Sequence, residues 1–156
     1  DRLSEAKLLK KLVLIKPNHS ERSFEKLVSL VESSQHLCEL DVSWQGVRPL
    51  TMIKLLRVLK ENRFMHSLSL GYNRLQEEPG DYRAKEANKK DSLSSFNEEA
   101  LAYLKEFANF NLNLVHFDLQ ATGMSELAML RVAKFTRKAW SVRCVHLCGN
   151  PGISAQ

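Results

Sequence analysis

A single recurring pattern constrains the fold of this chain more than any other feature of the sequence. Its clearest copy runs over Met65–Leu75 and reads apolar-x-x-Leu-x-Leu-x-x-Asn-x-Leu. The alternation of Leu68 and Leu70 predicts a short strand with both side chains on one face. Asn73 follows at the strand's end, and its side-chain amide can bond the backbone groups that a bend leaves open. The pattern therefore predicts a strand followed at once by a turn.

The same pattern occurs five times along the 156 residues, with an almost constant spacing. The first residues of its copies are Leu9, Leu37, Met65, Leu114 and Val142. Three of the four steps between them measure 28 residues, and the third measures 49, which indicates a single insertion of 21 residues. Segments of equal length that bury apolar side chains against their neighbours stack into a solenoid. The period therefore predicts a repeat protein in which each segment, called a rung below, supports the next.

Together the five copies resemble the leucine-rich repeats of the ribonuclease-inhibitor type, whose rungs are about this long and carry an α-helix in the second half. The resemblance covers nearly the whole chain. It implies an α/β leucine-rich repeat solenoid, or horseshoe, with a curved parallel sheet on the concave side and helices on the convex side. The chain departs from the pattern at the asparagine position of three rungs, which holds Pro17, Gln45 and Thr122.

Each of the first four rungs is predicted to hold a strand, a turn and a helix, and the fifth a strand and a turn. The remaining predicted strands are Lys10–Ile15, Cys38–Val42, Val115–Leu119 and Arg143–Leu147. The predicted helices are Ser23–Glu32, Leu50–Glu61, Ser95–Asn109 and Ser125–Ala139, with Pro49 in a first turn where proline is tolerated. We expect residues 1–156 to form one segment of about five rungs. Because neither end carries the polar cap that a solenoid needs, we expect this segment to belong to a longer solenoid.

The insertion falls at about residues 76–95, between the third turn and its helix. It mixes charges of both signs and holds few apolar residues, so it cannot bury enough surface to order itself. A mobile loop is therefore predicted. The helix is expected to open at Ser95, because Ser95 and Glu98 have the spacing of a capping box.

Composition limits where such a chain works. No apolar run approaches the ~20 residues that cross a bilayer, and the N-terminus lacks a signal-peptide core. Cys38, Cys144 and Cys148 have no framework spacing, which favours free thiols in a reducing compartment and a cytoplasmic location. The net charge of +5 allows acidic partners without requiring them.

The concave face offers the candidate binding residues, because alternate strand positions point away from the helices. Trp44 and Tyr72 follow neighbouring strands, which lie ~4.8 Å apart, so both should lie at one edge. Large aromatic side chains beside carboxylates are typical of protein-binding hot spots. The alternative is that Trp44 folds over its turn and covers the core. The candidate residues are Glu39, Asp41, Trp44, Tyr72, His116, Asp118 and His146.

A second candidate surface lies on the helices. Basic residues recur at equivalent helical positions and predict a basic column that could contact an acidic surface or nucleic acid; an ordinary solvated helix face is the alternative. These residues are Lys26, Lys54, Arg57, Arg131 and Lys134.

Metal binding and catalysis find less support. Cys144, His146 and Cys148 alternate beside His116, but residues four apart on a strand are separated by ~13 Å. Since a zinc–sulfur bond measures ~2.3 Å, the two thiols cannot share one ion, and no metal or cofactor is expected. The chain also shows no glycine-rich phosphate loop, no nucleophile elbow and no candidate nucleophile.

These observations predict a non-enzymatic scaffold that presents a concave surface to a protein partner. Similar repeat proteins include cytosolic receptors, tropomodulin-like actin binders, actin-capping regulators and subunits of ciliary assemblies, so a cytoskeletal or regulatory partner is implied. The resemblance also includes the activators of the Ran GTPase, which supply residues from the strand-to-helix turns. Arg74 lies in such a turn and would stabilise phosphoryl transfer in that alternative.

Overall fold

The computed structural model of the protein describes residues 8–14, 20–34, 36–75 and 90–151, with the backbone alone over 90–97. Predictions about Pro17 and about residues 76–89 of the insertion lie outside the described residues. Among the described helices, none is long and apolar enough to span a bilayer.

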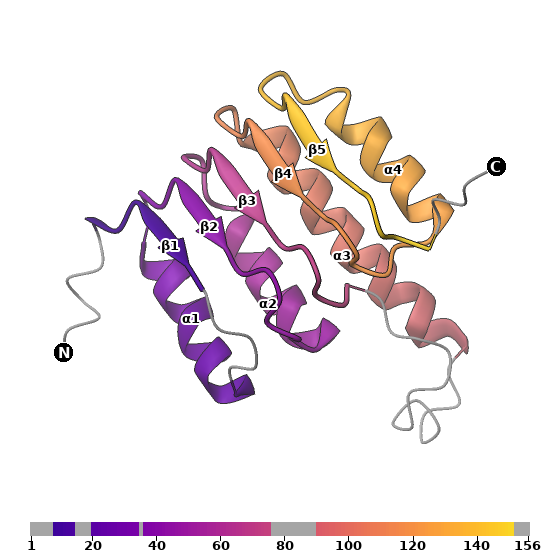
Figure 1. Ribbon diagram of the computed structural model, residues 1–156, viewed down its shortest axis with the longest axis horizontal. Coiled ribbons are helices and arrows are strands. Elements are labelled where there is room, and N and C mark those ends of the chain that lie inside the picture. Colours follow the sequence, from indigo (N-terminus) through magenta and orange to yellow (C-terminus); the bar gives the residue numbers. More distant parts are fainter. Residues whose placement is uncertain (1–7, 15–19, 35, 76–89, 152–156) are drawn as a thin grey trace.

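Five short strands form one parallel sheet in chain order (Figure 1). They are β1 (Lys11–Val13), β2 (Glu39–Asp41), β3 (Ser67–Ser69), β4 (His116–Asp118) and β5 (Cys144–His146). Their register aligns equivalent positions of the 28-residue period across the whole sheet. The central residues of the five strands form one continuous row of Leu12, Leu40, Leu68, Phe117 and Val145. The predicted leucine-rich repeat solenoid is therefore confirmed.

The strands are shorter than predicted, at three residues each. Backbone bonds nevertheless continue into the turns, where the amide of Val42 donates to Ser69 and the amide of Trp44 donates to Gly71. The chain bends directly after each strand, which ends the regular ladder without ending the hydrogen bonding between rungs.

Four helices cover one face of the sheet and lie side by side in chain order (Figure 1). They are α1 (Glu21–Ser33), α2 (Pro49–Leu59), α3 (Lys90–Phe110) and α4 (Glu126–Thr136). The side chains of Ser20 and Ser125 cap α1 and α4 by accepting bonds from the backbone amides of Ser23 and Ala128. Pro49 begins α2, as predicted.

The start of α3 corrects one prediction. The helix begins at Lys90, so Ser95 lies inside it and does not cap it. Residues 90–95, predicted as part of a mobile loop, are helical. Once the packed half of a helix has formed, each further residue adds a hydrogen bond at a small entropic cost, so moderate helix formers extend it.

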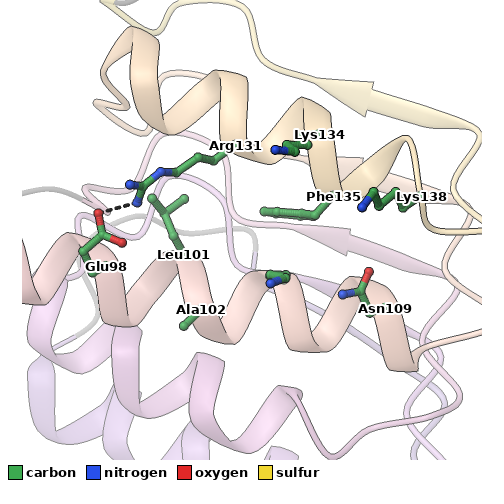
Figure 2. Close-up of a pocket in the computed structure, with 9 residues that line it drawn as sticks. Glu98, Leu101, Ala102, Asn109, Arg131, Lys134, Phe135 and Lys138 are labelled. Atoms are coloured by element: carbon green, nitrogen blue, oxygen red, sulfur yellow. Dashed lines mark hydrogen bonds and ion pairs between the residues drawn. The ribbon is translucent and has the colours of Figure 1, made fainter.

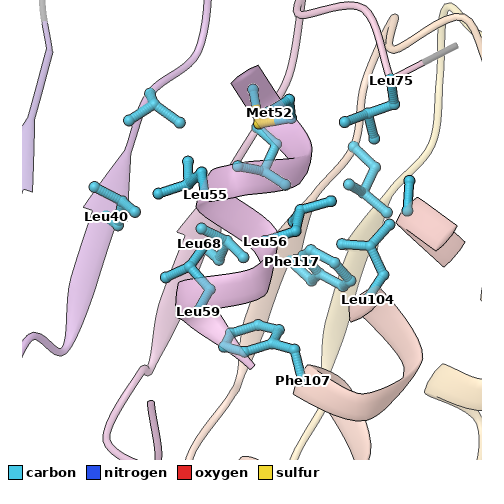
Figure 3. Packing of buried hydrophobic residues seen from close by; sticks show 14 of the residues in the cluster. Leu40, Met52, Leu55, Leu56, Leu59, Leu68, Leu75, Leu104, Phe107 and Phe117 are labelled. Carbon is cyan, nitrogen blue, oxygen red and sulfur yellow. The ribbon is translucent and has the colours of Figure 1, made fainter. Parts of the chain in front are cut away.

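The core lies between the sheet and the helices (Figure 3). Leu40, Leu68 and Phe117 of the strand row are at most 1% exposed. From the helices, Phe107 meets the ring of Phe117 edge-on, with centroids 6.2 Å apart. Helix α2 contributes a fully buried stripe of Met52, Leu55, Leu56 and Leu59.

Two buried asparagines tie successive turns together. The Nδ2 of Asn73 donates to the carbonyls of Val42 and Leu70, at 2.7 and 3.0 Å, while its Oδ1 accepts the amide of Gln45 at 3.1 Å. Asn150 does the same two turns later, with donations to Leu119 and Leu147. Each asparagine therefore satisfies backbone groups of its own rung and of the preceding one, as the pattern predicts.

The substituted turns are less completely bonded. Gln45 donates to the carbonyls of Leu14 and Ser43, but its buried Oε1 has no partner among the described residues. The hydroxyl of Thr122 bonds the carbonyl of Leu119 and the Oδ1 of Asn150. The departures from asparagine thus keep the turn but satisfy fewer neighbouring groups.

Candidate functional site

The concave face consists of the strand side chains that point away from the helices. On β1 and β2, Lys11 and Glu39 are register partners, and their charged groups lie 2.6 Å apart. Both side chains remain well exposed, at 64% and 45%. The predicted binding residue Glu39 therefore presents an ion pair to a partner, and its charge is compensated within the sheet.

Two other predicted residues, Asp41 and Asp118, hold the ends of their strands. Each carboxylate accepts the backbone amide two residues further on, at Ser43 and Gln120, with distances of 2.9 Å. Asp118 also accepts the hydroxyl of Ser69 at 2.9 Å. Both side chains are half-buried, so they combine a structural bond with partial access from the concave side.

Gly71 provides the space for this arrangement beside β4. A Cβ at that position would lie 3.1 Å from Oδ2 of Asp118 and 3.3 Å from Oδ1. The glycine therefore allows the Asp118 carboxylate to lie against the backbone of the neighbouring turn.

At one edge of this face, the side chains of Trp44 and Tyr72 stack on each other. Their ring centroids are 3.6 Å apart and their planes differ by 11°. Trp44 is 59% exposed and Tyr72 is 39% exposed, and the Tyr72 hydroxyl lies 3.3 Å from Oε1 of Gln120. The predicted adjacency is confirmed. Of the two placements left open for Trp44, the structure has the exposed one, and we call this pair the aromatic rim.

The backbone beneath the aromatic rim is left-handed. Trp44 and Tyr72 have φ values of 61° and 57°, and the equivalent residues Ala121 and Gly149 have 47° and 73°. The turn thus imposes this conformation on every rung from the second onward. For bulky side chains it is rare and costs about 1–3 kcal/mol, a type of strain that clusters at functional sites. Glycine would meet the requirement at least cost, yet two rungs carry large aromatics there.

The other end of the concave face carries a compact group of three polar side chains. His116, Cys144 and His146 each offer one ligand atom, and these atoms all lie within 4.8 Å of one another. The two imidazole rings are 4.9 Å apart between centroids. Cys148 does not belong to this group. The 28-residue period predicts that His116 lies beside Cys144, and this register was the sequence signal for a group without the second thiol.

On the helical side, ion pairs between successive helices neutralise much of the predicted basic column. Lys54 pairs with Glu25 of α1 at 2.6 Å, Arg57 pairs with Glu99 of α3 at 3.3 Å, and Arg131 pairs with Glu98. Hydrogen bonds to Tyr103 and then to Glu99 raise the pKa of Arg57 above its ordinary value. Within the described residues, Lys26 and Lys134 make no ion pair.

A groove between α3 and α4 brings several basic side chains together (Figure 2). It encloses about 520 Å³. Leu101 and Phe135 form apolar walls, and the Glu98–Arg131 pair lies at one end. Three lysines line the groove without an ion pair among the described residues: Lys105, Lys134 and Lys138. Lys105 and Lys138 were not predicted as binding residues. Lys138 lies in the turn after α4, and its four-residue spacing from Lys134 within the predicted helix Ser125–Ala139 was the signal that could have found it.

Arg74, the residue of the alternative GTPase-activator hypothesis, is exposed in the turn after β3. It follows the buried Asn73, which fixes the turn by its hydrogen bonds. Nothing else in the described part of this turn resembles phosphoryl-transfer machinery, and the alternative stays a prediction.

No protein-family model matches the sequence, and no curated protein does. Solved structures that are similar in fold include the following two. A tropomodulin C-terminal domain from Caenorhabditis elegans has a TM-score of 0.68 at 14% identity, over 94% of this chain and 78% of that one. A leiomodin-1 structure, described as actin-binding site 2, has a TM-score of 0.62 at 11% identity, over 94% and 75%. At such identities the likeness establishes the leucine-rich repeat-like fold alone.

Proposed function

We propose that this chain is a non-enzymatic scaffold that binds a cytoskeletal protein through its concave face, with the aromatic rim as the central contact. The observation that carries the proposal is the exposed stack of Trp44 on Tyr72, held in left-handed turns. Aromatic side chains lose little conformational entropy on binding, and stacking already restricts these two. The rim is therefore a rigid, flat and apolar surface beside a polar face.

The residues around the rim support recognition of a protein partner. Half-buried polar groups lie across β2 to β5, on Asp41, Asp118, His116 and His146. The Lys11–Glu39 ion pair lies at the β1 end of the concave face. Large aromatic side chains bordered by polar groups are typical of a binding hot spot. The 28-residue period favours assignment to the ribonuclease-inhibitor type of repeat. Three free thiols fit the reducing cytoplasm.

Actin is the first partner to test. One of the similar structures is described as an actin-binding site, and the other is a domain of tropomodulin. Because their sequences are so different from this one, the support concerns the class of partner and not the individual contacts.

The experiment measures binding of the chain to monomeric actin by titration and to filaments by co-sedimentation. In the double variant Trp44→Gly/Tyr72→Gly we expect binding to be weaker by roughly 30-fold or more, because hot-spot truncations cost about 2 kcal/mol or more. Glycine is the chosen replacement because it suits the left-handed backbone. The matched control is Trp140→Gly, which removes a 90% exposed tryptophan in the connection between α4 and β5.

One result would exclude actin as the partner, and two would contradict the role of the aromatic rim. Wild-type protein that binds neither form of actin would exclude this partner. A double variant that binds as tightly as wild type, or a Trp140→Gly protein that loses as much affinity, would show that the rim is not the contact.

The α3–α4 groove supports a second candidate function, the binding of an acidic segment. Its three lysines, which make no ion pair with the described part of the chain, and its apolar walls fit a peptide that alternates carboxylates with apolar residues. We expect Lys134→Glu with Lys138→Glu to abolish binding of a glutamate- and leucine-containing peptide, whereas Lys26→Glu on α1 leaves it intact. Binding should weaken as salt rises from ~50 to ~200 mM. Equal losses in both variants would point to nonspecific attraction.

A further inference from the structure

We infer that the concave face of β4 and β5 binds a zinc-type divalent ion through His116, Cys144 and His146. The three ligand atoms lie within 4.8 Å of one another. Two imidazoles and one thiol are ligands that zinc prefers, and their convergence on one point distinguishes this group from scattered surface residues. This inference does not depend on the proposed cytoskeletal partner.

The backbone already has the geometry that such a site needs. Cys144 and His146 are two residues apart on β5, so their side chains share one face of the sheet. His116 is the register partner of Cys144 on the neighbouring strand. All three ligands therefore come from rigid strand positions, which hold a site more accurately than loops do.

The side chains are close to the arrangement around a metal. With zinc–sulfur bonds of ~2.3 Å and zinc–nitrogen bonds of ~2.0 Å, tetrahedral ligand atoms lie about 3.3–3.8 Å apart. The Sγ of Cys144 is 3.1 Å from Nε2 of His146, and the widest separation in the group is under 4.8 Å. Side-chain rotations that move the ligand atoms by about an ångström would bring them to these distances. The side chains have room for such rotations, since the thiol and the rings are half-buried or exposed.

A neighbouring residue supports one of the ligands. The hydroxyl of Ser67 lies 3.1 Å from Nδ1 of His116, and Ser67 is the register partner of His116 on β3. Histidines that bind metals generally bond their second ring nitrogen to such a partner, which fixes the ring orientation. The Ser67 bond therefore leaves Nε2 of His116 for the ion.

The fourth coordination position faces the open side of the sheet. Three protein ligands with an open position are typical of zinc sites that bind water or an exchangeable group. A carboxylate, imidazole or thiolate of a bound protein could take that position, because it points to the same face as the aromatic rim. Cys148 lies in the turn after β5 and does not belong to this group.

Cobalt absorption tests the site directly. Reduced protein freed of metal by a chelator is titrated with Co²⁺, and Zn²⁺ is then added in competition. We expect one equivalent of Co²⁺ to produce a near-ultraviolet thiolate-to-cobalt band with intense tetrahedral visible bands, and Zn²⁺ to remove both. Zn²⁺ should also raise the unfolding temperature, because it binds the folded state selectively.

Variants separate this site from other thiols and imidazoles. Cys144→Ser and His146→Gln should each abolish the cobalt bands, while Cys148→Ser, Cys38→Ser and His36→Gln should retain them. Ser67→Ala should weaken Zn²⁺ binding by about 10- to 100-fold, which is typical for loss of a residue that supports a ligand.

Circular dichroism of each variant without metal checks that it is folded. Absence of the bands in wild-type protein would overturn the inference. Bands that survive Cys144→Ser, or that disappear equally in Cys148→Ser, would do so as well.

Discussion

On the buried side of the sheet, the row across the strands is apolar in every rung: Leu12, Leu40, Leu68, Phe117 and Val145. On the exposed side, the adjacent row changes from one rung to the next: Lys11, Glu39, Ser67, His116 and Cys144. Packing between neighbours demands similar residues on the first row, whereas the second row meets no such demand. The functional residues of a repeat protein are therefore expected at positions whose residue type changes from one rung to the next.

A substitution in the buried row should have the largest effect on stability. Phe117→Ala should lower the free energy of unfolding by about 3–5 kcal/mol, because it leaves a cavity against Phe107 and Leu68. Urea denaturation measures the change. Leu127→Ala on α4, a residue that is 61% exposed, is the control and should change stability by less than about 0.5 kcal/mol. Similar losses in both variants would contradict the packing of this row.

The two kinds of turn provide the next prediction. Asn73→Ala should cost about 3 kcal/mol, because it leaves buried groups of two rungs without partners. Gln45→Ala should cost about 1–2 kcal/mol, since its Oε1 already lacks a bond among the described residues. Urea denaturation of both variants checks the order. A Gln45→Ala protein that is the less stable of the two would show that the asparagine ladder is not the main tie.

The aromatic rim should matter far less for stability than for binding. Trp44→Gly removes a stacking contact worth about 0.5–1.5 kcal/mol and relieves left-handed strain of about 1–3 kcal/mol. These effects oppose each other, so the net change in unfolding free energy should stay within about 1.5 kcal/mol. Trp44→Ala keeps the strain and should be the less stable variant. If glycine were the more destabilising replacement, the strain argument would be wrong.

The smallest effect belongs to the exposed ion pair. Glu39→Gln should destabilise the protein by at most about 1 kcal/mol, because exposed pairs are weak and screened by salt. A double-mutant cycle with Lys11→Gln measures the coupling at low and high salt. A coupling well above 1 kcal/mol would place this pair among the structural contacts of the sheet.

Several features could be predicted because they depend on spacing alone. The period placed Leu40 beside Leu68 and Trp44 beside Tyr72, since equal steps along the chain become neighbouring positions in the sheet. The start of α3 could not be predicted in this way, because Ser95 carries a local capping signal that the growing helix overrides. The ion pairs that neutralise Lys54 and Arg131 could not be predicted either, since their partners lie 29 and 33 residues away on the preceding helix.

By itself, the sequence determined the architecture and the side of the sheet on which each strand residue lies, because a two-residue alternation within a 28-residue period has only one way to bury its leucines. The tertiary structure alone decided which exposed groups act together. It stacked the two aromatics, paired most of the basic column and brought His116 to Cys144 and His146. The physical reason is that these contacts depend on strand register, backbone conformation and side-chain rotamers across different rungs, which no local pattern encodes.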